Sequence, residues 1–388
     1  MQTKSKAAKS QNARNLSLGE RYRLQTWFLG IIAFSMILFL LVQARFILIS
    51  LVIAIILFAL TADAITAFSR LRIGSWKITN WLASMAAFTL IAVVLLTLSA
   101  IVISQVNSVV TTTLTYTDQA IAAVARLAAL FSPEAEATVE ASIRSIQVSS
   151  YITTLAGQAG NLLSATTLVI LFVGFMFAER LWFGTKLENL MDDKDRAARV
   201  GRIIHSIVRR VNHYLLVKTG VSAATGVAVY LVMQGFGLDF AGPMAILTFV
   251  LNYIPSVGSI IATILLALVA LIQVPEPATA LLIFVIAGMV QFMLGSVIDP
   301  MLMGRALRVS SFGIIVSLSF WGAVWGIPGM FLAVPIMVAI MIVCSHIPSA
   351  RPVAVLLSRE GLPDFGDEDE RTASAKPPAN PARNQAAE

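Results

Sequence analysis

The sequence predicts an all-α, polytopic membrane protein with about six full spans, two broken-helix hairpins and amphipathic helices outside the membrane. The first observation is composition, since 57% of the 388 residues are hydrophobic and only 13% are charged. Such a balance is typical of membrane proteins and unlike that of soluble enzymes. The second observation is that the apolar residues form runs, and two runs, 241–273 and 312–347, exceed the length of one crossing. The third observation is that proline and glycine, which interrupt helices, lie near the middle of both overlong runs.

The N-terminal quarter of the chain predicts a tail and three spans. Residues 1–25 are polar and basic, which places them on the cytoplasmic side by the positive-inside rule. Residues 26–106 hold three apolar segments, of which the first two are separated by only a few residues around Arg45 and therefore predict a helical hairpin. The three spans are residues 26–42, 46–61 and 81–106.

Residues 107–158 change character, because acids outnumber basic residues and apolar residues recur at helical spacing. This pattern predicts two amphipathic helices on the non-cytoplasmic side, and Ser132, Pro133 and Glu134 are typical of a helix start. An oligomer contact, a lid and a membrane-surface element are all compatible with them. Residues 159–178 then form the fourth span.

Residues 179–215 form a basic segment, which we expect in the cytoplasm. An apolar stripe runs through it, flanked by arginines. We interpret it as a basic amphipathic helix on the anionic inner leaflet, with a partner-binding helix as the alternative. The stripe consists of Val200, Ile203, Ile204, Ile207, Val208 and Val211.

Residues 216–347 form the predicted transport core, and a parity argument gives its topology. If the run 241–273 crossed once, Arg305 and Arg308 would lie outside, against the positive-inside rule. A run that turns back at Pro255 places both arginines inside. The same argument applied to the run 312–347 places the tail, residues 348–388, in the cytoplasm. The composition of that tail predicts disorder toward its end.

The core therefore reads as two units, each made of one span and one broken hairpin, which enter the membrane from opposite sides. This arrangement is an inverted repeat, which is typical of secondary transporters. Broken helices expose free amides and carbonyls at membrane depth, where such groups are tolerated only when they are buried in protein or line a wet cavity. The candidate residues of the solute or ion pathway are Asn252, Pro255, Ser256, Gly258, Gln291, Asp299, Gly326, Pro328 and Gly329.

Each candidate also has a structural interpretation. The prolines and glycines fit simple kinks and close helix packing. Gln291 either lines the pathway or bonds a neighbouring helix. Asp299 is either a coupling carboxylate or a solvated, helix-capping one near a membrane end. For Lys218 we expect the side chain to reach the membrane interface.

Residues 213–343 resemble the autoinducer-2 exporter family of bacterial inner-membrane proteins. The resemblance rests on several short motifs that occur in the same order along the chain. It implies a multi-pass inner-membrane transporter that forms a homo-oligomer. Members of that family are described as exporters of autoinducer-2 and others as sodium/proton antiporters. One departure is Asp299, where the family often has asparagine or another polar residue. The stretches are 214–218 (YLLVK), 252–258 (NYIPSVG), 299–305 (DPMLMGR), 317–322 (SLSFWG), 326–329 (GIPG) and 334–335 (VP).

We expect a secondary transporter that exports a small polar solute, autoinducer-2-like by resemblance, and is driven by an ion gradient, since the sequence has no phosphate-binding loop. The alternatives are a sodium/proton antiporter, which requires Asp299 to titrate, and a membrane scaffold. The expected partners are the lipid bilayer, the solute, a proton or sodium ion and further copies of the chain. No nucleic acid is expected, because the basic residues flank spans. Enzymatic activity, a cofactor and a metal site are not expected, with one cysteine and three histidines at no ligand spacing.

Overall fold

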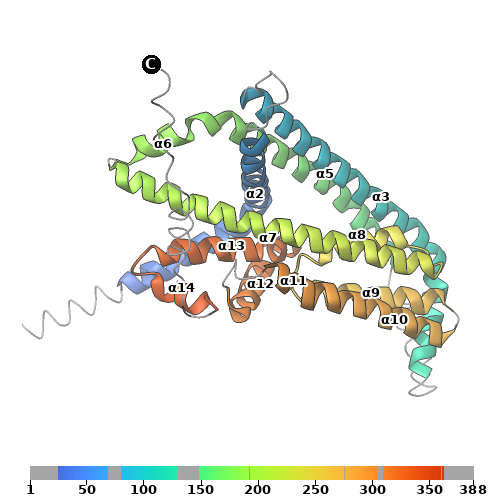
Figure 1. Cartoon of the computed structure of the whole chain (residues 1–388). Helices are drawn as coiled ribbons and strands as arrows, with labels where there is room; N and C mark the ends of the chain where they lie inside the picture. Colours follow the sequence, from blue (N-terminus) through green and yellow to red (C-terminus); the bar gives the residue numbers. More distant parts are fainter. Residues whose placement is uncertain are drawn as a thin grey trace, which may run out of the picture.

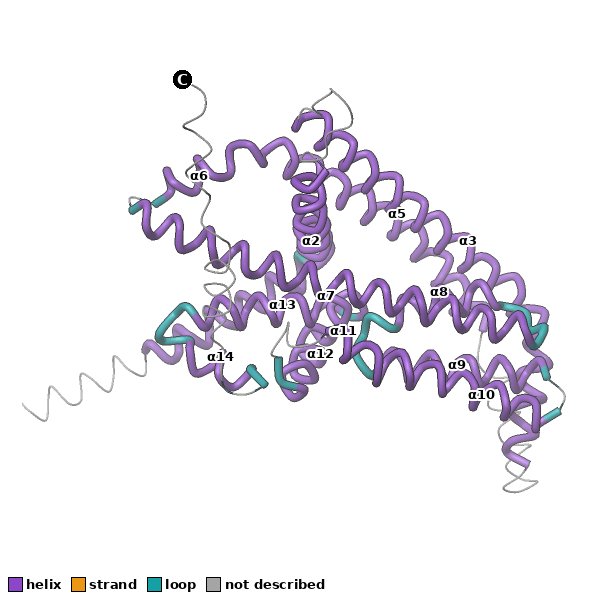
Figure 2. The backbone as a smooth tube through the Cα atoms, viewed as in Figure 1, coloured by secondary structure: helices purple, strands orange, loops and turns teal. Residues whose placement is uncertain are grey.

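The computed structural model describes residues 25–68, 80–129, 148–191, 193–274, 276–303, 309–359 and 361. The regular elements within these ranges are helices, apart from one isolated bridge between Val309 and Ser358, which confirms the all-α class (Figures 1 and 2). The first helix is Gln25–Gln43. The others are α2 (Arg45–Phe68), α3 (Asn80–Ala129), α5 (Val148–Glu179), η1 (Arg180–Trp182), α6 (Phe183–Leu190), α7 (Lys194–Gly235), α8 (Ala241–Leu251), α9 (Val257–Gln273), α10 (Pro277–Phe292), the π-helix η2 (Met293–Ile298), α11 (Asp299–Met303), α12 (Ser311–Trp325), α13 (Ile327–Ser345) and α14 (Arg351–Leu357).

Six helices of the described chain are long and apolar enough to cross a membrane, which confirms a polytopic membrane protein. Their number agrees with the prediction, but the set differs. The apolar part of α2, Arg45–Thr61, is shorter than the rest, whereas α13 qualifies although it is one arm of a hairpin. The six are Gln25–Gln43, Trp81–Val106, Gly160–Glu179, Lys194–Gly235, Pro277–Met303 and Ile327–Ser345.

The helices α2, α3 and α5 pack into a three-helix arm at the upper right of Figure 1. Its core contains Ala54, Ile91 and Val173, and a hydrogen bond of 2.8 Å joins the hydroxyls of Ser99 and Thr166. This arm supports the remaining helices, since α2 contacts α7, and α3 contacts α8 and α9.

The arm also corrects the predicted helix boundaries. The 50 residues of α3 form one helix, because neither proline nor glycine interrupts them. Residues 107–129 therefore extend the third span, and residues 148–158 likewise belong to α5. The predicted helix start at Ser132–Glu134 lies outside the described residues. The side of the membrane on which these extensions lie stays a prediction.

The first two helices do not form the hairpin expected around Arg45. They meet at Ala44, whose amide donates to Leu40 O and whose carbonyl accepts from Leu48 N, at 2.9 and 3.0 Å. These are ordinary helical i→i−4 bonds on both sides of the junction. Only Ala44 separates the two helices, which leaves no loop long enough for a hairpin. The helical ladder is interrupted there, since the carbonyl oxygen of Leu41 accepts from Trp325 Nε1 at 3.0 Å.

The 42-residue helix α7 runs through the middle of the molecule, and the other elements are arranged around it (Figure 1). No proline interrupts it, so the basic segment 179–215 continues from residue 194 into the start of the transport core as one helix. Part of the apolar stripe on this helix packs against α13: Ile203, Ile207 and Val211 join a cluster with Val338 and Met341. The expectation that this stripe lies on lipid is therefore wrong for these residues, which cover a protein surface.

The run 241–273 forms a hairpin, as predicted. The helices α8 and α9 are separated by the turn that contains Pro255, drawn in teal in Figure 2. The two ends of the hairpin lie together, because the backbone amide of Asp239 donates to the side-chain oxygen of Gln273 at 2.7 Å. Gly258 permits this geometry, since a Cβ at that position would overlap the carbonyl oxygen of Leu251.

The run 312–347 forms a second hairpin of α12 and α13, also as predicted. The chain reverses at Gly326, whose φ of 68° favours glycine. The hydroxyl of Ser317 on α12 donates to the carbonyl oxygen of Ala333 on α13 at 2.8 Å. Gly329 repeats the role of Gly258, because a Cβ there would overlap the carbonyl oxygen of Trp321. In both hairpins a glycine therefore allows the two arms to pack closely.

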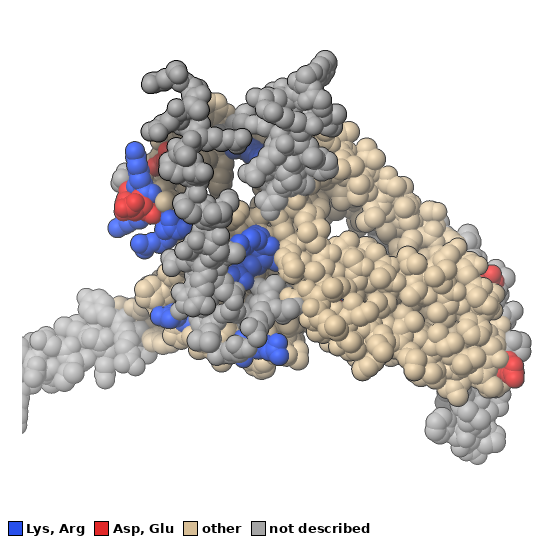
Figure 3. Space-filling view, viewed as in Figure 1, with Lys and Arg blue, Asp and Glu red and all other residues tan. Residues whose placement is uncertain are grey.

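Charged side chains gather at the two ends of the molecule (Figure 3). Lysines and arginines, with some acids, lie at the end formed by α6, α14 and the start of α7, whereas Asp and Glu lie at the far end, where α7 ends and α10 begins. Between them this face is uncharged. A long uncharged band with charges at both ends is the surface expected of a membrane-embedded protein.

Candidate functional site

The tip of the first hairpin is buried against the second hairpin. Ile254 packs in a cluster with Leu318 of α12 and Ala333 of α13. The ring of Tyr253 stacks on Phe331 of α13, with 4.3 Å between centroids and an interplanar angle of 21°. The first break therefore lies at the contact between the two hairpins.

Hydrogen-bonding side chains connect this tip to α7. Asn252 is 2% exposed, and its amide nitrogen donates to the hydroxyl of Ser222 at 3.2 Å. The amide oxygen of Asn252 accepts from the hydroxyl of Ser259 at 3.4 Å. The hydroxyls of Tyr253 and Thr219 lie 2.6 Å apart. We call these five residues the tip network; its neutral donors and acceptors are suited to a small polar solute.

Ser256 marks the sharpest point of the tip. Its backbone has φ 62° and ψ −47°, and Val257 N donates to Pro255 O at 2.7 Å. This is a γ-turn with positive φ, a rare and strained conformation for a residue with a Cβ. The side chain of Ser256 is exposed and lies outside the tip network. Among the candidates, Pro255 and Ser256 therefore shape the turn, whereas Asn252 offers the buried polar group.

A buried ion pair lies beside the tip network. Lys218 Nζ donates to Asp299 Oδ2 at 2.6 Å, and the two side chains are 5% and 14% exposed. The expectation that Lys218 reaches the interface is wrong, and Asp299 is not a freely solvated carboxylate. Sequence reasoning missed the pairing, although a signal existed. Residues 216–347 hold one lysine and only three acids, and charges within a membrane domain favour pairing.

The π-helix η2 ends directly before Asp299, and π-helical turns are frequent at functional sites. A Cβ added to Gly295 in this segment would contact the hydroxyl of Ser259 at 3.5 Å, so η2 lies against the tip network. Gln291 lies one turn before Gly295, on the same face of α10. It is 5% exposed, and its side-chain oxygen has no partner among the described residues. Gln291 is thus a further buried polar group near the first break.

The second break is not part of this polar arrangement. Gly326 and Pro328 are exposed, while the neighbouring Trp325 donates from Nε1 to Leu41 O at 3.0 Å. The surrounding cluster is apolar and includes side chains of the helix Gln25–Gln43 and of α2. Among the candidates at the second break, Gly326 allows the chain reversal and Gly329 allows close packing. No polar side chain of the tip network is bound to them within the described chain.

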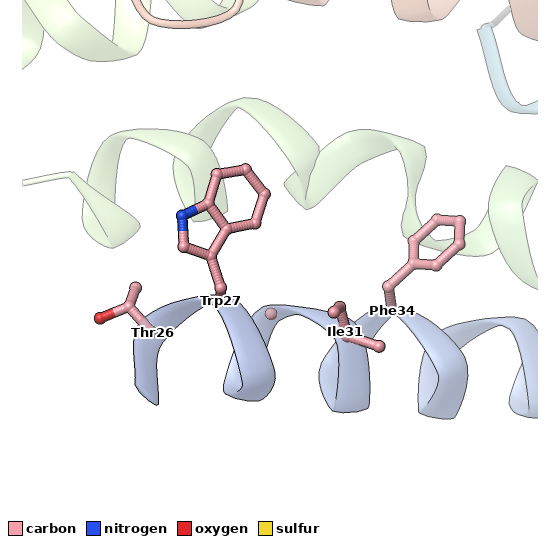
Figure 4. A pocket seen from close by; sticks show the side chains of 5 residues that line it. Thr26, Trp27, Ile31 and Phe34 are labelled. Carbon is pink, nitrogen blue, oxygen red and sulfur yellow. The ribbon is translucent and has the colours of Figure 1, made fainter. Parts of the chain in front are cut away.

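A separate groove lies at the start of the first helix. Thr26, Trp27, Gly30, Ile31 and Phe34 line it, and Figure 4 shows Trp27 and Phe34 pointing to the same side of that helix. The lining is almost entirely apolar, and it contains no candidate residue. The groove therefore adds nothing to the polar site.

Comparison with known proteins agrees with this architecture. The profile of the AI-2E family transporter matches residues 29–349. The AI-2 transport protein TqsA of Escherichia coli is 32% identical over 218 residues, which are 53% of this chain and 59% of TqsA. A candidate transport protein of Borreliella burgdorferi is 30% identical over 220 residues, 55% of this chain and 60% of that protein. The alignments thus span less than two thirds of either relative. The family profile covers most of the chain, and the protein belongs to the AI-2E transporter family.

Proposed function

We propose that this membrane transporter is a secondary transporter that exports a small polar solute across the bacterial inner membrane. The tip network carries the proposal, because it places neutral hydrogen-bonding groups at a broken helix between the two repeats. The relative named AI-2 transport protein supports a solute of the autoinducer-2 class. Asn252, Ser222, Ser259 and Gln291 supply donors and acceptors for the hydroxyl and carbonyl groups of such a solute.

Alternating access gives the two hairpins their role in this proposal. The tip of the first hairpin is packed on α12 and α13, so a movement of one repeat against the other uncovers the tip network. The strained turn at Ser256 makes this tip a suitable place for such a movement. Energy then comes from the gradient of an ion that moves with or against the solute.

The distribution of charge supports an orientation. The basic end in Figure 3 faces the cytoplasm by the positive-inside rule. The basic composition of residues 1–25 supports the same side for the N-terminal tail. The ends of the first hairpin then face the other side of the membrane, and the ends of the second face the cytoplasm. Most apolar side chains of the helix Gln25–Gln43 are exposed, apart from a few near its end that pack against the second break, and this exposure fits contact with lipid or with a second copy in a homo-oligomer.

Cation/proton antiport is the second candidate function. The observation that favours it is the Lys218–Asp299 pair, because a buried carboxylate within a membrane protein is a suitable carrier of a proton or sodium ion. An antiporter moves these ions in sealed vesicles without any organic solute, whereas a coupled exporter requires the solute.

The test is flux into sealed proteoliposomes with an imposed proton or sodium gradient and an autoinducer-2-class solute. We expect the wild type to accumulate the solute and Asn252→Leu, which keeps a similar volume, to lose at least about tenfold in rate, since its polar partners stay unpaired. The matched control is Gln234→Leu, an exposed amide at the end of α7, which should retain the rate. Full flux in Asn252→Leu would place the solute elsewhere.

A further inference from the structure

The Lys218–Asp299 pair joins the two repeats. Lys218 lies on α7 of the first repeat, and Asp299 begins α11 of the second. Both side chains are at least 86% buried, and the atoms are 2.6 Å apart. A contact of this kind holds the repeats together in the arrangement seen here and is lost when they separate.

Two buried oxygen atoms at and beside this ion pair have no hydrogen-bond partner within the described chain. Asp299 Oδ1 is shielded from solvent and has no hydrogen-bond partner within the described chain. The hydroxyl of Tyr214, one turn before Lys218 on α7, is buried and unpartnered in the same way, and it interacts electrostatically with Asp299. Buried polar groups without partners are rare in folded proteins and call for an explanation. A site that is occupied in another state of the protein supplies one.

Few other ionisable groups surround this carboxylate. Lys218 and Tyr214 face it from α7, and Tyr253 lies on the adjoining tip of the first hairpin. The described parts of α9, α10, η2, α12 and α13 carry no Asp, Glu, Lys, Arg, His or Tyr, and Cys344 lies at the far end of α13. Arg305 and Arg308 lie outside the described residues. Lys218 is thus the charged group that contacts Asp299 within the described chain.

We propose that Asp299 is the binding site of the coupling cation, a proton or a sodium ion, and that this cation competes with Lys218 for the carboxylate. The inference rests on the proposed transport function. When the cation binds, the Lys218 ammonium loses its counterion and needs water, since an unpaired charge is costly in a buried place. The repeats then separate and admit water, and the π-helix beside Asp299 gives the chain a segment that can readjust. Release of the cation restores the pair and closes the site.

The test measures opening directly, with no solute present. A cysteine is introduced by Val221→Cys, one turn after Lys218 on α7, in a Cys344→Ser background, and its reaction with a small water-soluble thiol reagent is timed. Val221 is 2% exposed, so the cysteine reacts only when the surroundings of Lys218 open to water. The rate is divided by that of a small free thiol at the same pH, because only the thiolate reacts. We expect this corrected rate to rise at least about fivefold when the pH falls or when sodium replaces a bulky organic cation. Ala287→Cys on α10, where Ala287 is 1% exposed, serves as a second reporter.

The matched variants identify the site. In Lys218→Met/Asp299→Asn both charges are absent, and the labelling rate should no longer respond to pH or to sodium. Glu276→Gln removes an exposed acid at the far end and should leave the response intact. A response to pH alone assigns the proton, and a response to sodium at constant pH assigns sodium. The proposal would be overturned if the labelling rate of the protein with Lys218 and Asp299 intact changed with neither pH nor sodium. It would also be overturned if the double variant still responded to either.

The outcome is separable from that of the flux assay. Labelling that responds to the cation in a protein that moves no solute would reject the exporter and leave the cation site in place. Solute flux together with unresponsive labelling would reject the cation site and leave the exporter.

Discussion

A methyl group added by Gly258→Ala or Gly329→Ala is expected to destabilise the protein by at least about 3 kcal/mol, at the upper end of the cost of overpacking. In both hairpins the new Cβ would overlap a backbone carbonyl oxygen of the opposite arm, of Leu251 or of Trp321. Backbone atoms cannot swing aside as a flexible side chain can, so the two arms must separate. Thermal unfolding of the purified protein in detergent measures the effect.

Two controls belong to this prediction. Gly288→Ala on α10 has nothing within 4 Å of the new Cβ and should be neutral or slightly stabilising. Ser256→Gly relieves the positive φ at the tip of the first hairpin and should stabilise by up to about 1 kcal/mol. If Gly258→Ala and Gly329→Ala were as stable as Gly288→Ala, the arms would not be as closely packed as described.

Removal of one charge from the Lys218–Asp299 pair has the second large expected effect. Lys218→Met or Asp299→Asn alone should cost about 3–5 kcal/mol, because each leaves a buried charge without its partner. The double variant should regain most of that stability, since two neutral groups need no counterion. A double-mutant cycle of unfolding free energies measures the coupling between the two residues.

Both single variants should thus be less stable than the wild type and than the double variant. Single variants that unfold like the wild type would show that the pair is hydrated and contributes little. Equal losses that simply add in the double variant would show that Lys218 and Asp299 do not interact.

The two hairpins were predictable from the sequence because their signals are local. Pro255 and Gly326 interrupt runs that are too long for one crossing, and the positions of Arg305 and Arg308 fix the parity of crossings. The structure confirms that both runs turn back. Local chain chemistry decides where a helix breaks, so it can be read without knowledge of the neighbours.

The ends and surroundings of helices were less predictable, because packing decides them. The sequence indicates a composition change after residue 106, yet α3 continues to Ala129, since a change in polarity does not end a helix. The stripe around Ile207 is equally suited to lipid and to protein, and only the fold places it on α13. Helical periodicity identifies an apolar face but not its partner.

The site was predicted in part. Asn252 lies in a buried polar network, whereas Gly326, Pro328 and Gly329 form a break with apolar neighbours. The two breaks have the same local pattern, so the sequence does not distinguish them. Lys218 and Asp299 are 81 residues apart, and each considered alone favours solvent at a membrane end. Their pairing becomes visible only when both lie in one fold.

Membrane topology tests the central claim, which is that the two hairpins enter the membrane from opposite sides. Single cysteines are introduced in the Cys344→Ser background by Asp239→Cys, Glu276→Cys and Ser349→Cys, and cells are treated with a membrane-impermeant thiol reagent. The ends of the first hairpin lie together, so positions 239 and 276 should both react in intact cells. Position 349, after α13, should react only after permeabilisation. Reaction of position 276 only after permeabilisation would show that the first hairpin crosses completely and would contradict the inverted repeat.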